Sequence, residues 1–208
     1  MNRDVCNIIK KYGKMLESQE YSVGKNPQIF LKINGRVYAN RPECDFNNLK
    51  EEDVLTFTLE MGSDKNNAVK LLLEQDRIRS LVISNTPYCQ KCREAEKEIE
   101  ACLDDMAQII GPRVKIARDD FREIRTSLKH SEGCFVRGKY TITAGRTPYE
   151  AVVALTVLEK AAEVQIKAEK IGGGRKIPII EAKLMRFNYK KKYSKAESEI
   201  KEKEVSGI

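Results

Sequence analysis

The sequence has no long apolar run. Of its 208 residues 41% are hydrophobic, but charged residues interrupt every hydrophobic stretch before the roughly 18 residues that a membrane span needs. The N-terminal stretch, residues 1–13, is amphipathic rather than a signal peptide, because charged side chains break any apolar core within a few positions. We therefore expect a compact cytoplasmic protein with no membrane partner.

Histidine is almost absent, and His130 is the only one. We place it in a loop, and a single imidazole cannot form the histidine pairs and triplets that hold zinc in many enzymes. The six cysteines are expected to be reduced. Cys89 and Cys92 have the spacing of a redox or zinc motif, but no second CxxC and no neighbouring histidine accompany them. Two helical thiols one turn apart are therefore favoured over a metal or redox site.

The charge has no strong pattern either. The chain has 38 basic and 31 acidic residues and a net charge of +7, and the two signs are mostly interspersed. No zinc-finger spacing and no aromatic RNA-binding motif is present. A solvated basic surface is favoured over specific nucleic-acid binding, which rests on the net charge alone.

The periodicity of apolar residues predicts a mixed α and β protein. Asn34 and Gly35 form a strong hairpin signal between two short strands. Thr147 to Glu150 is a capping box with proline at the first helical position, and it begins a long helix that stops near residue 172. Further expected helices cover residues 2–18, 64–73, 87–111 and 119–129, and further strands cover residues 29–33, 36–39, 55–59, 81–83, 114–117 and 134–143.

Residues 80–112 carry a recognisable pattern. A short apolar strand at residues 81–83 leads to a polar turn, then to Pro87 and Tyr88, and later to the sequence MAQIIGP at residues 106–112. Together with the helix TPYEAVVALTVLEKAAEVQIKAEKIGG, this resembles the class II aldolase/adducin family across about residues 2–180. The resemblance implies an α/β fold, a three-layer α/β/α arrangement around a central, mainly antiparallel mixed sheet. It also implies a single domain over residues 1–180, a charged C-terminal tail over residues 181–208, and a homo-oligomer, by resemblance a tetramer.

The sequence departs from this family where its metal ligands belong. A family strand ends in His-x-His, whereas this chain has Ile83, Ser84 and Asn85, and Lys139 stands at the place of the third histidine. The family would use zinc, but we predict no cofactor and no metal ligands here, because isoleucine cannot ligate and lysine is positively charged. Asp64 is the nearest match to the family's catalytic glutamate, although its interpretation as a helix cap is favoured unless a metal or substrate lies nearby.

Three hypotheses of function remain open. The first is a protein with a degenerate metal site that acts as an oligomeric binding or assembly protein. The second is a sugar-phosphate aldolase, lyase or epimerase with a changed or metal-free mechanism, in which Asp64 moves a proton and Lys139 replaces the cation or forms a Schiff base. The third, a nucleic-acid or membrane-surface binder, rests on charge alone and ranks last. In the first two, Arg41, Ser84 and Asn85 are expected to contact a small phosphorylated or carbonyl ligand.

Overall fold

The computed structural model describes residues 2–19, 27–58 and 66–206, with the side chains of residue 2 and of residues 193–206 excepted. Its centre is an eight-stranded sheet with the order β3-β2-β1-β4-β8-β7-β6-β5. All neighbouring strands are antiparallel except β6 and β7, which are parallel. The predicted α/β fold with a mainly antiparallel mixed sheet is therefore confirmed.

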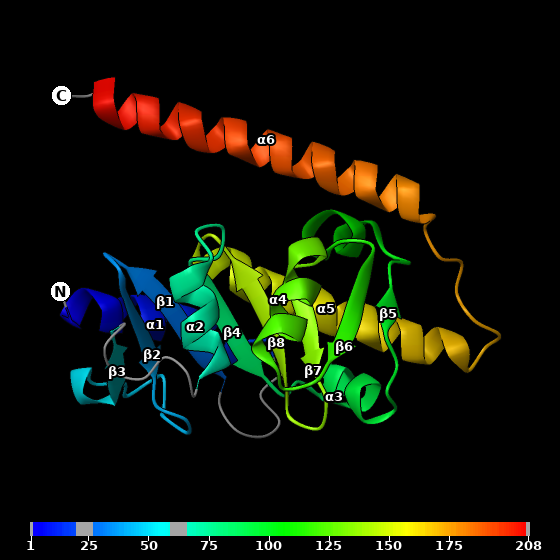
Figure 1. Cartoon of the computed structure of the whole chain (residues 1–208), viewed down its shortest axis with the longest axis horizontal. Helices are drawn as coiled ribbons and strands as arrows, with labels where there is room; N and C mark the ends of the chain where they lie inside the picture. Colours follow the sequence, from blue (N-terminus) through cyan, green and yellow to red (C-terminus); the bar gives the residue numbers. More distant parts are fainter. Residues whose placement is uncertain (1, 20–26, 59–65, 207–208) are drawn as a thin grey trace.

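The strands and helices alternate irregularly along the chain (Figure 1). The strands are β1 (Gln28–Ile33), β2 (Arg36–Asn40), β3 (Val54–Phe57), β4 (Ser80–Ser84), β5 (Ile99–Glu100), β6 (Arg113–Ala117), β7 (Gly133–Val136) and β8 (Tyr140–Gly145). The helices are α1 (Asn2–Glu17), α2 (Asn67–Glu74), α3 (Pro87–Glu94), α4 (Phe121–His130), α5 (Pro148–Glu169) and α6 (Ile179–Ser206), with a 3-10 turn η1 (Glu51–Asp53) and a π-helix η3 (Met106–Ile110).

The alternation of side chains along each strand produces the three layers. In β1, Phe30 packs on one face with residues of α2 and α4, while Ile29 and Leu31 pack on the other face with α1 and α5. The helices α3 and α5 and the π-helix η3 share a further apolar cluster on that second face, which includes Phe135 of β7. Two helical layers thus cover the sheet, as the resemblance implied.

The local signals that were strongest in the sequence are confirmed. Asn34 and Gly35 both have positive φ, 50° and 75°, which is the backbone that a two-residue hairpin turn requires. The helix α5 begins at Pro148, and the side chain of Thr147 accepts a hydrogen bond from the backbone N–H of Glu150. The hydroxyl group therefore satisfies one of the free N–H groups of the first helical turn.

Two predicted segments differ from the structure. The continuous helix expected over residues 87–111 is wrong: α3 ends at Glu94, Glu96 has a left-handed φ of 50°, and β5 and η3 follow. Pairing of β5 with β6 and of Ala101 N–H with the Pro112 carbonyl replaces helical hydrogen bonds there. The helix α2 is capped by Asn66, whose side chain accepts from two backbone N–H groups, and the expected cap at residues 62–64 lies outside the described residues.

The last helix, α6, runs along the end of the sheet that is uppermost in Figure 1. Its first turns pack against η3, and Ala182 and Arg186 are buried there. Both residues belong to the segment expected as a charged tail, so the first turns of α6 pack on the domain. The domain division at residue 180 stays a prediction. In the described part of the chain, no helix has the length and apolar character to cross a membrane.

Candidate functional site

The strand directions bring the predicted site residues to one end of the sheet. The strands β2 and β4 are both antiparallel to β1, which lies between them. They therefore run in the same direction and end at the same side of the sheet. The turn between β7 and β8 lies there too, since β8 is antiparallel to β4. Arg41, Ser84, Asn85 and Lys139 therefore share this end, which we call the lower edge (Figure 1).

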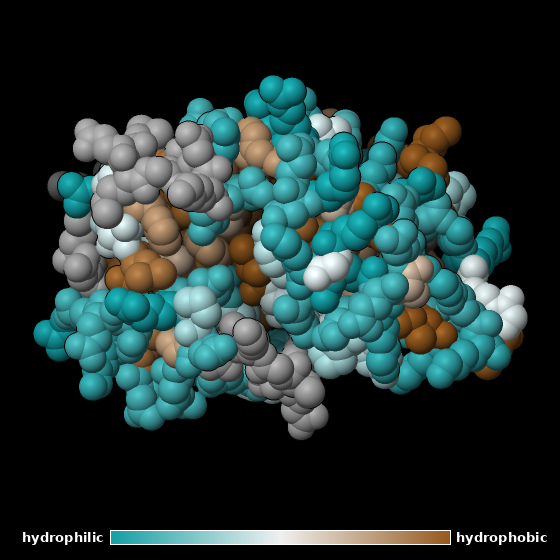
Figure 2. Space-filling view, turned by 60° about the horizontal axis from the view of Figure 1, so that its bottom comes forward, coloured by the Kyte–Doolittle hydropathy of each residue, from teal (hydrophilic) through white to brown (hydrophobic). Residues whose placement is uncertain are grey.

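Figure 2 turns the lower edge towards the viewer. Most of the visible surface is hydrophilic, with hydrophobic side chains in a narrow hollow near the middle of this face. Asp64, the predicted catalytic carboxylate, lies outside the described residues, so its role stays a prediction.

Arg41 is held on the outer part of the lower edge. It is exposed, its backbone N–H bonds to the Asp53 carbonyl at 2.8 Å, and its Nε donates to the Glu52 carbonyl at 3.2 Å. Since β1 and β4 separate β2 from β8, Arg41 and Lys139 are about three strand spacings, roughly 14 Å, apart. Arg41 and Lys139 thus both lie at the lower edge, but they do not contact each other.

Lys139 is bound to a carboxylate. Its Nζ lies 2.5 Å from Oδ2 of Asp119, and the Tyr140 hydroxyl donates to Oδ1 of the same carboxylate at 3.2 Å. The charge of Lys139 and these hydrogen bonds hold the pKa of Asp119 below its ordinary value. The amine of Lys139 is therefore engaged in an ion pair rather than free to attack a ligand.

The centre of the lower edge contains buried oxygen atoms without partners. Ser84 pairs with Thr141 of β8, so their side chains lie on the same face of the sheet. In the part of the chain that the structure describes, the buried atoms Asn85 Oδ1 and Thr141 Oγ1 have no hydrogen-bond partner, while the Thr86 hydroxyl lies within reach of the Cys89 thiol. Buried polar groups are nearly always paired, so two such atoms at two adjacent strand ends need a physical explanation.

Arg93 adds a buried positive charge on α3, the helix that follows this turn. It lies on α3, which packs against β7 and β8, and only 5% of the residue is exposed. Its Nε and Nη1 atoms are buried and have no partner among the described residues. Burial lowers the pKa of Arg93, while the charge of Glu94 beside it acts in the opposite direction. Sequence reasoning missed this residue, because Lys91 and Glu94 beside it make the helix look solvated.

Cys89 lies on the same face of α3 as Arg93, one turn earlier. The thiol is fully buried, and burial followed by the nearby charge of Glu159 raises its pKa well above the ordinary value. The Glu159 carboxylate accepts from the backbone N–H groups of Tyr88 and Cys89 at 2.7 and 2.9 Å, so it caps the first turn of α3 from the neighbouring helix α5. Cys89 is therefore in a protonated, packed state rather than poised as a nucleophile.

The CxxC pair has no metal-binding environment in the described residues. Cys92 is buried, and burial raises its pKa to about 11. Throughout the described ranges, no three His, Cys, Asp or Glu side chains lie close enough together to hold a metal ion. The interpretation of Cys89 and Cys92 as two packed helical thiols agrees with this arrangement.

Asn40 is a second residue that sequence reasoning missed. Its buried side chain accepts from the Ile29 N–H at 2.7 Å and donates to the carbonyls of Pro27 and Arg41 at 3.1 and 3.0 Å. The side chain fastens the end of β2 to the start of β1. The backbone of the lower edge is thus fixed by a structural hydrogen-bond network beside Arg41.

Neither a family model nor a curated protein matches the sequence. An L-fuculose 1-phosphate aldolase superposes with a TM-score of 0.81 at 16% identity, over 90% of this chain and 96% of the other. YgbL of Klebsiella pneumoniae, described as a candidate aldolase, epimerase or decarboxylase, gives 0.74 at 13% identity over 89% and 99%.

An aldolase II superfamily protein from Pseudomonas syringae gives a TM-score of 0.66 at 11% identity, over 97% of this chain and 92% of the other. At such low identities the likeness concerns the course of the backbone rather than the chemistry of the site. Together these likenesses identify the fold of the chain as that of the class II aldolase superfamily.

Proposed function

We propose that the protein is an oligomeric binding or assembly protein that holds a small anionic ligand at the lower edge, without a catalytic metal. The observation that carries this proposal is the buried guanidinium of Arg93, two of whose nitrogens have no partner among the described residues. Removing a cation from water costs several kcal/mol unless an anion compensates it. A phosphate or carboxylate group would supply that compensation.

The partnerless oxygens support the same proposal. The hydroxyl group of Thr141 can donate to an anion, and Asn85 Oδ1 can accept from a ligand hydroxyl. These atoms are buried, so entry of a ligand requires a small movement of the turn between β4 and α3. The ligand class is a small phosphorylated or carbonyl compound.

The donors that the described residues place at the lower edge are not the ones that zinc prefers, which supports the metal-free proposal. Zinc takes about four ligands, mainly cysteine, histidine and carboxylate groups. Ser84 and Asn85 offer neutral oxygens, and Lys139 offers a cation already bound to Asp119. The proposal therefore includes no step through a metal.

The alternative is a lyase or epimerase that acts without zinc through Lys139. The ion pair with Asp119 argues against it, because it occupies the Lys139 amine that would have to attack a carbonyl group. Trapping with sodium borohydride and a carbonyl compound tests the alternative. A reduced adduct on Lys139, absent from Lys139→Ala, would establish the enzymatic hypothesis in place of ours.

The assembly part of the proposal is supported by α6. Ile180, Leu184 and Phe187 follow the i, i+4, i+7 spacing of one helix face, and they are 84%, 59% and 64% exposed. A second copy of the chain would remove this apolar stripe from water. Light scattering after gel filtration should give an oligomer for the wild type and a smaller species for Leu184→Glu, with Lys192→Glu, an exposed change on another face of the helix, as the matched control.

The binding part is tested by elemental analysis and calorimetry. Protein purified without chelator or affinity-tag metal should contain less than about a tenth of an equivalent of zinc, and near one equivalent would overturn the metal-free proposal. Titration with dihydroxyacetone phosphate and with inorganic phosphate should show binding that Arg93→Met abolishes and that Lys91→Met, an exposed change on the same helix, leaves intact. Equal binding by both variants would exclude Arg93 as the anion contact.

A further inference from the structure

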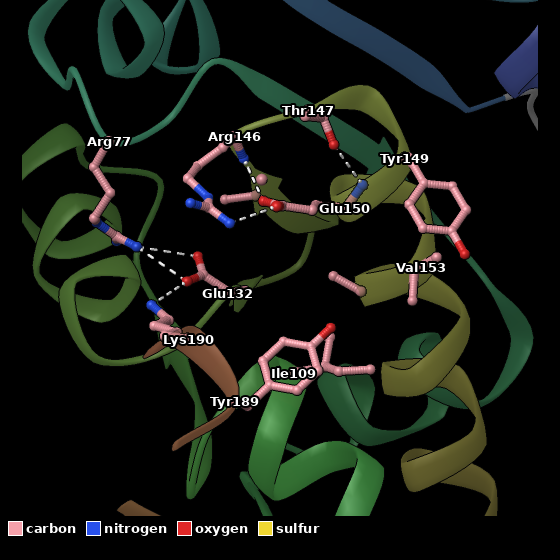
Figure 3. A pocket seen from close by; sticks show the side chains of 13 residues that line it. Arg77, Ile109, Glu132, Arg146, Thr147, Tyr149, Glu150, Val153, Tyr189 and Lys190 are labelled. Atoms are coloured by element: carbon pink, nitrogen blue, oxygen red, sulfur yellow. Dashed lines mark hydrogen bonds and ion pairs between the residues drawn. The ribbon is translucent and has the colours of Figure 1, made fainter. Parts of the chain in front are cut away.

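A cavity of about 360 Å³ lies at the other end of the strands β4 and β8, under α6 (Figure 3). Its walls come from η3, the start of α5, the segment before β4, and the α6 residues Tyr189 and Lys190. This volume is within the range of small-molecule sites. We call it the upper cavity.

The charged end of the upper cavity is built around the carboxylate of Glu132. Its Oε1 lies 3.1 Å from Nη1 of Arg77, 2.9 Å from Nη2 of Arg186 and 2.8 Å from Nζ of Lys190. Burial would raise the pKa of Glu132, but these three positive charges outweigh burial and hold the pKa below its ordinary value. Glu132 is therefore ionised, and one carboxylate faces three cations.

The remaining charged pair is neutral overall. Arg146 and Glu150 bond to each other at 3.0 Å, and Figure 3 shows them along one side of the cavity. Among the described residues, three cations and two carboxylates line this end, and Arg186, bound to Glu132 outside the lining, brings the cluster to a surplus of two positive charges. Surplus charge in a partly desolvated site favours an anion.

The opposite end of the upper cavity is apolar. Ile109, Val153 and Ala154 line it, with the rings of Tyr149 and Tyr189 on its rim. Figure 3 shows Arg77, Glu132 and Lys190 on one side and Tyr149 and Val153 on the other. Flat aromatic side chains at a rim favour a flat apolar body through ring stacking and edge contacts.

We propose that the upper cavity binds a small aromatic carboxylate, with the carboxylate against Lys190 and Arg77 and the ring between Tyr149 and Tyr189. The cation surplus selects the negative group, and the apolar wall selects the ring. A ligand in this position contacts α6 and the sheet at once, and it therefore fastens α6 to the domain. The proposal is independent of ligand binding at the lower edge, because the two places lie at opposite ends of β4 and β8.

The test is calorimetric titration of the full chain with 3-phenylpropionate. Two variants separate the two ends of the cavity: Lys190→Gln removes a cation, and Val153→Phe fills the apolar end. We expect Lys190→Gln to weaken binding about tenfold, as loss of one charge-assisted contact does, and Val153→Phe to abolish it. The matched control Lys191→Gln, an exposed position on the same helix, should bind like the wild type, and circular dichroism melts check that each variant is folded.

Ligand analogues decide the chemical class. The neutral 3-phenylpropionamide should bind at least about tenfold more weakly, because it lacks the charge that the surplus cations select. Equal affinity for the amide, for hexanoate or for inorganic phosphate would overturn the assignment of an aromatic carboxylate. Undiminished binding in both Lys190→Gln and Val153→Phe would overturn the assignment of the site.

Discussion

Replacing Arg93 by methionine is expected to stabilise the protein while it removes anion binding. Each unsatisfied buried donor costs about 1–3 kcal/mol, and Nε and Nη1 of Arg93 are two such donors. Methionine keeps most of the apolar stem and removes the charge. Replacing a buried, poorly compensated charge by an apolar group is often stabilising by about 1–4 kcal/mol. We therefore expect a gain of roughly 1–3 kcal/mol in the free energy of unfolding.

The assay is urea unfolding in a buffer without multivalent anions, with and without phosphate. For a chain of this size each kcal/mol shifts Tm by about 2–4 °C, so thermal scans should agree. Phosphate at about 100 times its Kd should stabilise the wild type by about 2.7 kcal/mol and Arg93→Met by nothing. A loss of stability in Arg93→Met, or the same phosphate effect in both proteins, would refute the reasoning.

Arg186 provides the contrasting control. This arginine is also buried, but it donates to Oε1 of Glu132 at 2.9 Å, to the Ile109 carbonyl at 3.2 Å and to the Ile110 carbonyl. Arg186→Met removes satisfied hydrogen bonds from a charged donor, each worth about 1.5–3 kcal/mol, while Glu132 keeps two other cations. It should cost roughly 2–4 kcal/mol, the opposite sign to Arg93→Met.

Three further predictions concern packing and titration. Because Glu132 has a lowered pKa in the folded state, its contribution to stability is complete above its ordinary value near 4.5 and is lost as the pH falls below that value, so Glu132→Gln should flatten this acid part of a urea-midpoint profile from pH 3 to 7. A profile with unchanged slope would contradict the charge cluster. Asn40→Ala should cost roughly 2–4 kcal/mol in urea unfolding, because it leaves the Ile29 N–H and two carbonyls unpaired. In native protein a thiol reagent should modify the half-buried Cys102 before the buried Cys89, as peptide mass mapping would show, and early labelling of Cys89 would mean that α3 opens readily.

The fold was accessible from the sequence largely through its resemblance to a known family. Local chemistry alone located the Asn34–Gly35 hairpin and the start of α5, where turn and capping residues leave few alternatives. Local chemistry failed over residues 87–111, because the apolar spacing there suits a helix while strand pairing between β5 and β6 decides the backbone. A tertiary hydrogen-bond ladder cannot be read from a local period.

The candidate site was accessible only in part. Ser84, Asn85 and Lys139 were singled out through the resemblance to the family, which places its metal ligands at these positions. Arg93 could not be assigned, since its burial depends on how α3 packs against β7 and β8. Glu132 and Arg186 are 54 residues apart, and no pattern within either segment indicates their contact.

The ladder between β4 and β8 joins the lower edge to the upper cavity through five consecutive residue pairs, from Ser80 with Gly145 to Ser84 with Thr141. At about 3.3 Å per residue the two ends are roughly 13 Å apart. The strands cannot slip by one residue without turning every side chain to the other face, so the ladder behaves as a rigid spacer. The increases in the free energy of unfolding caused by ligands at its two ends should therefore be additive. Any coupling free energy between the two ligands would have to be the same whichever ligand is added first.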